Sequence, residues 1–551
     1  MHSLRLTRPL HLAALLLPIA LYGTLLVLLT NRLAHDQGPV YALDDVYIHM
    51  AMAKNLALHG VWGVTPWETT NASSSPLWVA LLAAGFALFG ANPWLPLVLA
   101  TLSSLLAIAV GWRALQPPSL REGQRQEDRL AGALAVALVT AVVAFASLPA
   151  LTVQGMEHPL HAALLLWAAL LLCRLVSGDA PSRPIPFLVL IALLPLLRYE
   201  SLWLVVLGTM LLALRRRYGL AMLTLLCGLG PVVAFGLWSV GKGQEFLPAA
   251  ILTKSVGPML LSGDDPVLIL ARFTWHPLQR MASQPVLLTL WMAADLILLS
   301  RLIELRRRIL ERRDLVLLGL FAVGAWVHAT VGTFGWGARY EAYLIVLGIA
   351  AVGGWMLRWR ERPAPAGAGP RFWAAATMTA LLLAAFVATG MERMLVVTIN
   401  ASVASREVRD RDMVVADFFA TAYPRQSVMA MNIGAIVWRG DPHLTDVLAL
   451  GTVQVLRLFL RGELDAAAID RIARQRDVKV AAIFDDWFVD WAGGPLGWIA
   501  VAEFDPHSNR DLRYRLYVRD PAEAPLLAEK LRAFATPPGF RTTIALLPPW
   551  N

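Results

Sequence analysis

Charged residues and cysteines are both scarce in this sequence. Only 16% of the 551 residues are charged and 57% are hydrophobic, with a mean hydropathy of +0.57. A soluble domain typically has about 25% charged residues. The composition therefore excludes a disordered, fibrous or small secreted chain. The two cysteines, Cys173 and Cys227, both lie in apolar stretches, so the sequence predicts no disulfide framework.

The apolar residues occur in stretches of the length that crosses a bilayer, about 20 residues for a hydrocarbon core of ~30 Å. The first stretch follows Arg5 and Arg8 and lacks a clear cleavage site, so we interpret it as a retained anchor and not as a signal peptide. The short stretch Ser75 to Gly90 is expected to lie in the membrane interface or to re-enter the membrane. We expect eleven crossings, at about residues 11–30, 94–113, 130–147, 160–176, 184–197, 201–214, 219–238, 285–304, 315–333, 341–357 and 372–391.

The distribution of basic residues predicts the orientation of these crossings, because Lys and Arg accumulate in cytoplasmic loops. With a cytoplasmic N-terminus, the inner loops hold 21 Lys and Arg residues and the outer loops hold 8. The net charge of +9 divides into +10 before residue 392 and −1 after it. The positive charge therefore indicates membrane orientation and not a nucleic-acid partner.

The sequence changes character after residue 391. An odd number of crossings places residues 392–551 on the outer face as one domain, and residues 1–391 form the transmembrane domain. Strand-like runs alternate there with helix-like stretches, which is typical of a small α/β layer. The expected strands are 427–431, 478–484, 498–504 and 514–518, and the expected helices are 406–421, 452–461, 465–476 and 521–535.

An acidic pair, Asp44 and Asp45, lies in the first outer loop. Adjacent carboxylates repel each other and are placed apart unless a function uses them. One interpretation is that a carboxylate removes a proton from an acceptor hydroxyl, as a general base does. The other is that the pair stabilises the amino end of the following helix, where negative charge is favourable.

Further ionisable residues occur at the expected outer face. Each alone fits an interfacial or paired residue, since a charge at the bilayer centre costs roughly 2.5–3.5 kcal/mol. Together, carboxylates and cations suit a reaction in which a hydroxyl is deprotonated while a phosphate departs, because Arg and Lys bind phosphate oxygens. No ATP-binding loop is visible, so the donor is expected to arrive already activated. Because the outer face lacks nucleotide sugars, a lipid-linked phosphosugar is the natural donor. These residues are Glu157, Arg198, Glu200, Lys254 and Arg339.

Several short motifs follow one another along the chain. They are Asp44-Asp45-Val-Tyr47-Ile-His49, Thr69-Thr-Asn71-Ala-Ser-Ser-Ser-Pro76, Gly155-Met-Glu157, Arg198-Tyr-Glu200, Arg339-Tyr340 and Leu444-Thr-Asp446. In this order they resemble the motifs of polytopic glycosyltransferases of the GT-C fold that use polyprenyl-phosphate sugars. The resemblance is greatest to the subgroup with the terminal β-(1→2) arabinofuranosyltransferase and pilin-modifying arabinosyltransferases. The family's usual Arg-Pro-Glu is Arg-Tyr-Glu here, and its Gly-Leu-Glu is Gly-Met-Glu.

The resemblance implies an inverting transfer of arabinofuranose from a polyprenyl phosphate to a hydroxyl of a cell-envelope acceptor, on the periplasmic face of a bacterial inner membrane. It implies Asp44, in preference to Asp45, as the catalytic base, and Ser75 to Gly90 as the juxtamembrane helix of the fold. Asp446 matches a family position that contacts the acceptor or another domain. The implied donor-binding residues are Lys254 and Arg339 for the phosphate, with Arg198, Glu157, Glu200, His49 and Tyr340 beside them.

Two other functions are considered, a lipid-linked sugar transporter or flippase and a ligase that transfers a glycan from a lipid diphosphate. Transporters place ionisable groups near the bilayer midplane and often contain internal repeats, whereas here the charges gather at one face and no repeat is visible. The acceptor is a glycan, a lipid or a protein, and the sequence leaves lipopolysaccharide, pilin and another cell-envelope glycan open. The sequence requires no cofactor, and no His and Cys residues have the spacing of a zinc site. Whether the reaction uses a divalent cation stays open.

Overall fold

A computed structural model describes most of the chain. The described residues are 16–35, 38–116, 129–178, 183–254, 266–305, 309–360, 370–493, 496–507 and 513–550. Residues 11–15 of the first expected crossing lie outside them. Contacts between residues divide the chain into two compact units, and each is described by itself. The first unit comprises Met1–Asn31, Leu97–Val233 and Ser255–Asn400, and the second comprises Arg32–Pro96, Ala234–Lys254 and Ala401–Asn551.

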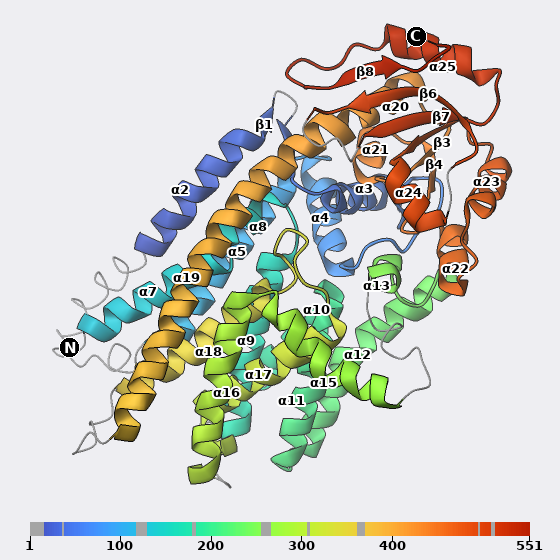
Figure 1. Cartoon of the computed structure of the whole chain (residues 1–551). Helices are drawn as coiled ribbons and strands as arrows, with labels where there is room; N and C mark the ends of the chain where they lie inside the picture. Colours follow the sequence, from blue (N-terminus) through green and yellow to red (C-terminus); the bar gives the residue numbers. More distant parts are fainter. Residues whose placement is uncertain are drawn as a thin grey trace. The chain divides into compact units, whose positions relative to one another are not determined.

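Each expected crossing lies on a helix (Figure 1). Within the described residues, six helices are long and apolar enough to span a membrane by length and composition, and several shorter helices are also apolar. The chain is therefore a multi-pass membrane protein, and its eleven crossings stay a prediction. The helices are α2 (Leu16–Leu33), α5 (Leu95–Leu115), α7 (Arg129–Phe145), α9 (His158–Ser177), α10 (Ile185–Leu197), α11 (Leu202–Leu214), α12 (Tyr218–Gly241), α16 (Pro285–Leu305), α17 (Arg313–Val331), α18 (Ala342–Arg360) and α19 (Pro370–Glu407).

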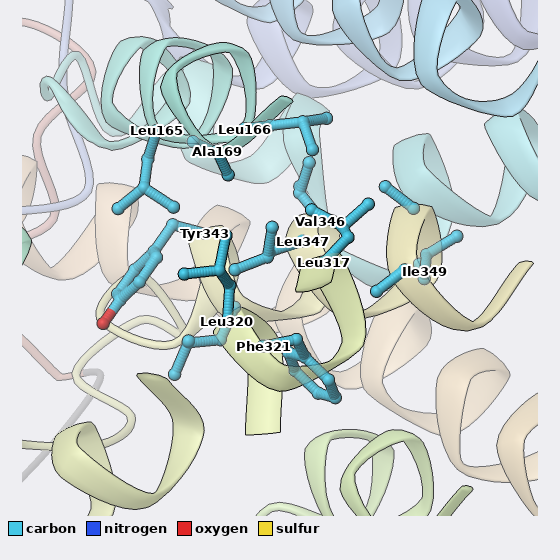
Figure 2. Packing of buried hydrophobic residues seen from close by; sticks show 14 of the residues in the cluster. Leu165, Leu166, Ala169, Leu317, Leu320, Phe321, Tyr343, Val346, Leu347 and Ile349 are labelled. Atoms are coloured by element: carbon cyan, nitrogen blue, oxygen red, sulfur yellow. The ribbon is translucent and has the colours of Figure 1, made fainter. Parts of the chain in front are cut away.

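The core of the first unit forms where α9, α17 and α18 pack together. These helices are apolar on all sides and most of their residues are buried, as expected of helices enclosed by other helices. Gly348 lets α18 approach closely, because a Cβ there would lie 2.7 Å from the ring of Phe321. Figure 2 shows the interlocking side chains, which include Leu165, Leu166 and Ala169 from α9, Leu317, Leu320 and Phe321 from α17, and Tyr343, Val346, Leu347 and Ile349 from α18.

Three further helices are absent from the sequence-based expectation. They are α8 (Leu148–Val153), α13 (Ala249–Lys254) and α15 (Pro266–Ala282). In the second unit, α3 (Asp44–His59) packs against α4 (Pro76–Phe89). The helix α4 coincides with the stretch expected in the membrane interface. Its 14 residues span about 21 Å at 1.5 Å per residue, which is short for a crossing.

The second unit contains a six-stranded mixed sheet, which confirms the expected α/β domain (Figure 1). The strand order is β4-β3-β5-β7-β6-β8. β3 runs parallel to β4 and β5, and the remaining pairs are antiparallel. The strands β4 and β8 were not expected from the sequence. The strands are β3 (Ser427–Ala430), β4 (His443–Asp446), β5 (Val480–Ile483), β6 (Ile499–Asp505), β7 (Tyr514–Val518) and β8 (Thr543–Leu546).

Short helices accompany this sheet. Four of them correspond to expected helices, whereas α21 and α24 were missed because each is only one or two turns long. A two-residue hairpin, β1 (Ala34–His35) with β2 (Gly38–Pro39), precedes α3. The helices are α20 (Val414–Ala422), α21 (Gly434–Arg439), α22 (Val453–Arg461), α23 (Ala466–Gln475), α24 (Asp485–Ala492) and α25 (Glu523–Ala533).

The expected domain boundary at residue 391 lies inside α19. The helix continues to Glu407, then passes through a π-helical turn, Val408–Met413, into α20. Between residues 391 and 413 the sequence contains neither proline nor glycine, so nothing local ends the helix where the polarity changes. A π-turn adds a residue to the helical turn and redirects the side chains that follow, and such turns are frequent at functional sites.

Candidate functional site

The acidic pair lies in the first turn of α3, where negative charge complements the positive end of the helix. The residue before the helix, Leu43, makes no side-chain capping bond, and α3 ends at Gly60 with a φ of 68°. The two carboxylates contact different groups, the amides of Gly434 and Ala435 for Asp44 and Lys254 for Asp45. Successive helical residues point about 100° apart, so Asp44 and Asp45 meet different parts of the second unit.

Asp44 binds the amino end of α21. The amide of Gly434 donates to Asp44 Oδ2 at 2.8 Å, and the amide of Ala435 donates to Oδ1 at 2.9 Å. A Cβ on Gly434 would lie 2.2 Å from the Asp44 carbonyl oxygen and 2.8 Å from Oδ1, so only glycine permits this approach. Asp44 therefore stabilises the amino end of α21 through these two hydrogen bonds, in addition to placing a negative charge in the first turn of its own helix.

The other end of α21 is held by the same helix. Lys54, ten residues after Asp44 on α3, donates from Nζ to the carbonyl oxygens of Val437 and Trp438 at 3.4 Å each, and to Asp441 Oδ1 at 3.1 Å. A carboxylate at the amide end and an ammonium at the carbonyl end both complement the helix dipole. The position of α21 on α3 is therefore defined at both ends.

The environment of Asp44 shifts its proton affinity. Burial first, and then the negative charge of Asp412, raise the pKa of Asp44 to about 7 from an ordinary 3.8, and the amides of Gly434 and Ala435 oppose the rise. A general base is most effective when its pKa lies near the working pH. Each carboxylate oxygen has two acceptor positions, and each uses one on α21. Asp44 thus retains the capacity to accept a proton.

Asp412, which sequence reasoning did not identify, belongs to the π-turn and is 2% exposed. Its Oδ1 accepts from Asn432 Nδ2 at 3.1 Å and from the Tyr514 hydroxyl at 3.0 Å. Arg411 donates to both carboxylate oxygens, at 3.2 and 2.9 Å. The only sequence signal is the run from Arg406 to Asp412, in which every residue except Val408 is charged.

Asp45 and Lys254, two predicted site residues, are brought together. Lys254 Nζ lies 3.2 Å from Asp45 Oδ1 and 3.3 Å from Oδ2. Lys254 ends α13, whose first residue, Ala249, donates its amide to the Asn71 carbonyl oxygen at 2.8 Å. The Lys254 side chain is 36% exposed, so an anion in solution has access to its ammonium group.

His49 and Asp446 lie in the same unit. His49 is on α3, four residues after Asp45, and is buried. Asp446 is fully buried and accepts from the amides of Leu448, Leu450 and Gly451 at 2.8, 2.6 and 2.6 Å. Burial raises the pKa of Asp446 to about 6, against the effect of these amides and of the Lys254 charge. Asp446 therefore organises the turn after β4.

The remaining predicted residues form a cluster in the first unit. Arg198 donates to Glu157 Oε1 at 3.0 Å and to Glu200 Oε2 at 3.1 Å, and its second contact to Glu200 is also an ion pair. The guanidinium carbons of Arg198 and Arg339 lie 5.2 and 5.0 Å from the centre of the Tyr340 ring. One cation between two carboxylates makes Arg198 a structural centre of this cluster, whereas Arg339 contacts the tyrosine ring and hydroxyl.

An unusual loop positions Arg339. Four successive residues before it, Gly335 to Ala338, have positive φ angles of 77°, 48°, 79° and 60°. This conformation costs roughly 1–2 kcal/mol at each residue other than glycine. Gln154 Nε2 donates to the Gly337 carbonyl oxygen at 2.8 Å and holds the loop. The strain is concentrated next to a buried arginine, as is common at binding sites.

Among the described residues, no three His, Cys, Asp or Glu side chains are grouped as a metal site. The second unit holds a partly buried carboxylate with a raised pKa, Asp44, and a partly exposed lysine, Lys254, paired with the neighbouring Asp45. This combination in the second unit suits proton removal from a hydroxyl and binding of an oxyanion.

Comparisons with known proteins define the fold. Residues 401–518 match the family model described as "Domain of unknown function (DUF8728)". No curated protein matches the chain in sequence. In structure the chain is similar to ArnT from Cupriavidus metallidurans bound to undecaprenyl phosphate, with 15% identity and a TM-score of 0.50 over 92% of this chain and 98% of that one. It is also similar to the apo oligosaccharyltransferase of Archaeoglobus fulgidus, with 12% identity and a TM-score of 0.48 over 93% and 74%. The likeness to ArnT shows that the chain has the GT-C fold of membrane glycosyltransferases.

Proposed function

We propose that the protein is an inverting glycosyltransferase that moves a sugar from a polyprenyl-phosphate donor to a hydroxyl of a cell-envelope acceptor. The observation that carries the proposal is the first turn of α3. There a partly buried carboxylate with a pKa of about 7, Asp44, is followed directly by the Asp45–Lys254 ion pair. The structure of ArnT, which has the same fold, contains undecaprenyl phosphate, and this supports a lipid phosphate donor for this chain.

In the proposed step, the acceptor oxygen attacks the anomeric carbon of the donor sugar while its proton passes to the Asp44 carboxylate. The bond between the anomeric carbon and the phosphate oxygen breaks, and its electron pair leaves with the lipid phosphate. The phosphate changes from a singly charged diester to a monoester with one more negative charge. Lys254 stabilises this developing charge, and Asp45 orients Lys254. Attack opposite the leaving group inverts the anomeric centre.

The first unit contributes its own proposal. Arg339, beside the strained loop, is proposed to bind donor phosphate or sugar hydroxyls, with Tyr340 as a ring surface. Arg198 is already balanced by Glu157 and Glu200, so we assign it to holding this cluster together. Two residues of the second unit, His49 as a donor contact and Asp446 as an acceptor contact, remain proposals of the same kind.

The finer identity is also proposed. Motif resemblance supports arabinofuranose as the sugar, and the excess of basic residues in the expected inner loops supports a bacterial inner-membrane location with the reaction on the periplasmic face. The proposed transfer step uses no metal ion. Adding a chelator to the assay tests whether transfer depends on a divalent cation.

The test uses the purified protein in vesicles with a labelled polyprenyl-phosphate pentose and a membrane extract as acceptor source. The proposal expects equal amounts of free polyprenyl phosphate and of pentose bound in the opposite anomeric configuration. A preference for lipid-diphosphate glycans in competition would instead indicate a ligase. Movement of the labelled lipid across vesicles without any transfer would indicate a flippase.

A further inference from the structure

We propose that Asp412 is a positioning residue for the catalytic base, because it anchors the turn before α21 whose amides hold the Asp44 carboxylate. This inference rests on the proposed function, in which Asp44 is the base. It assigns a role to the π-turn between α19 and α20, which the reaction scheme above does not use.

The contacts of Asp412 lead directly to Asp44. Asn432 donates its side-chain amide to Asp412, and Gly434, two residues later, donates its backbone amide to Asp44. The residue between them, Ile433, is 1% exposed and precedes the first turn of α21. A displacement of Asn432 is therefore transmitted to both amides that hold the base.

Asp412 is itself fixed from two further directions. Tyr514 lies on β7, in the interior of the sheet, and donates its hydroxyl at 3.0 Å. Arg411 pairs with both oxygens of Asp412, and its guanidinium carbon lies 5.2 Å from the centre of the Phe484 ring. The sheet and the π-turn thus determine where Asn432 is held, so the geometry of the base depends on residues far from it in sequence.

The π-turn carries a second pair that serves as an internal comparison. Arg409 donates to both oxygens of Asp410, each at 2.6 Å, and the amide of Arg541 donates to Asp410 Oδ1 at 3.1 Å. Asp410 is 3% exposed, almost as buried as Asp412. Asp410 holds the segment before β8, whereas Asp412 holds the segment before α21. Asp410→Asn and Asp412→Asn each remove one negative charge from the same turn. Only Asp412 is linked to Asp44 through Asn432.

Asp412 also affects Asp44 electrostatically. Its charge contributes to the raised pKa of Asp44, after burial. Removing that charge while the amides remain is expected to lower the pKa of Asp44 and make it a weaker base. The charged and titratable groups that interact with Asp44 include Asp45 and Tyr47 on α3, Asp412 on the π-turn and Tyr514 on β7. Arg439 on α21 acts on Tyr47, and Arg411 on the π-turn acts on Tyr514.

The experiment measures transfer against pH for the full-length protein and the variants Asp412→Asn, Asn432→Ala and Asp410→Asn, with a labelled polyprenyl-phosphate sugar. In Asp412→Asn, which removes a charge that raises the pKa of Asp44, we expect the acid limb of kcat/KM to move to lower pH. We also expect kcat to fall roughly 10- to 100-fold. In Asn432→Ala, which keeps the Asp412 charge, we expect a similar fall in kcat with little change in donor KM. In Asp410→Asn the limb and kcat should stay at parental values.

The outcomes separate this inference from the proposed function. If Asp44→Asn abolishes transfer while Asp412→Asn and Asn432→Ala both behave like Asp410→Asn, the base is correct and the positioning role of Asp412 is wrong. If Asp44→Asn transfers at the parental rate, the proposed base is wrong and this inference fails with it. Should Asp412→Asn not fold, Asn432→Ala decides: a parental kcat overturns the role, and a 10-fold loss supports it.

Discussion

The contact between Asp44 and Gly434 makes the substitution Gly434→Ala a direct test of how the base is held. A new Cβ would lie 2.2 Å from the Asp44 carbonyl oxygen and 2.8 Å from its Oδ1. The first of these atoms belongs to the backbone of α3 and has little freedom to move. Either α21 stays in place with a severe overlap, or it shifts and loses the two amide bonds to the carboxylate.

The cost of each response is known approximately. Overpacking of an ordered interior costs about 1–3 kcal/mol, and each hydrogen bond to a charged group contributes about 1.5–3 kcal/mol. The less costly response dominates, so Gly434→Ala is expected to destabilise the second unit by about 1–3 kcal/mol. A domain of this size loses about 2–4 °C of thermal midpoint for each kcal/mol.

The pH dependence of transfer shows which response occurs. The amides of Gly434 and Ala435 lower the pKa of Asp44, so their loss moves it above about 7. Activity should then fall most at pH 6 and recover toward pH 8.5. If α21 stays in place, the midpoint falls and the pH profile is unchanged.

A matched control is present at the other end of α21. A Cβ at Gly440 would lie 3.5 Å from Ala420, which is ordinary contact. Gly440→Ala should therefore leave both the thermal midpoint and the pH profile close to those of the parent. If Gly434→Ala is as stable and as active as Gly440→Ala, the close approach of Asp44 to α21 is refuted.

Three further substitutions give separate tests. Arg198→Gln leaves the buried Glu157 and the partly buried Glu200 without their cation and should destabilise the first unit by about 3–5 kcal/mol. Adding Glu200→Gln should partly restore this loss in thermal unfolding, and no recovery would contradict the pairing. Lys254→Gln should raise the KM for the lipid donor roughly 10-fold or more, whereas the exposed control Lys242→Gln should not, and equal values would remove Lys254 from the donor site. Because the folded pKa of Asp44 is about 7 against an ordinary 3.8, its contribution to stability is present below about pH 4 and is lost as the pH rises through about 7. The thermal midpoint of the parent, relative to that of Asp44→Asn, should therefore fall between pH 4 and 7, and a constant difference would contradict the raised pKa.

The helices were predictable because their signal is local. An apolar run of the right length forms a helix at each expected crossing, whatever its neighbours are. The end of α19 was not predictable in the same way. The polarity change after residue 391 marks a change of surroundings, and the helix continues through it to Glu407 because no residue there breaks it.

The candidate site was predictable as a set of residues but not as an arrangement. Asp44 and Asp45 were recognised as a pair, yet the structure gives them separate partners, α21 for Asp44 and Lys254 for Asp45. Asp412 was missed because its importance depends on Asn432 and Tyr514, which lie 20 and 102 residues away. Gly434 carries no signal at all until the carboxylate 390 residues earlier is placed against it.

The most direct test of the central claim is the single-turnover transfer rate of Asp44→Asn at saturating labelled polyprenyl-phosphate sugar, with donor binding measured separately. The substitution keeps the size of the side chain, replaces one carboxylate oxygen by an NH2 group and removes the ability to take up the acceptor proton. We predict donor affinity within a few-fold of the parent and a transfer rate reduced about 100- to 10,000-fold, with Glu463→Gln, an exposed carboxylate 58% accessible, at the parental rate. A parental transfer rate in Asp44→Asn, and again in Asp45→Asn, would contradict the account.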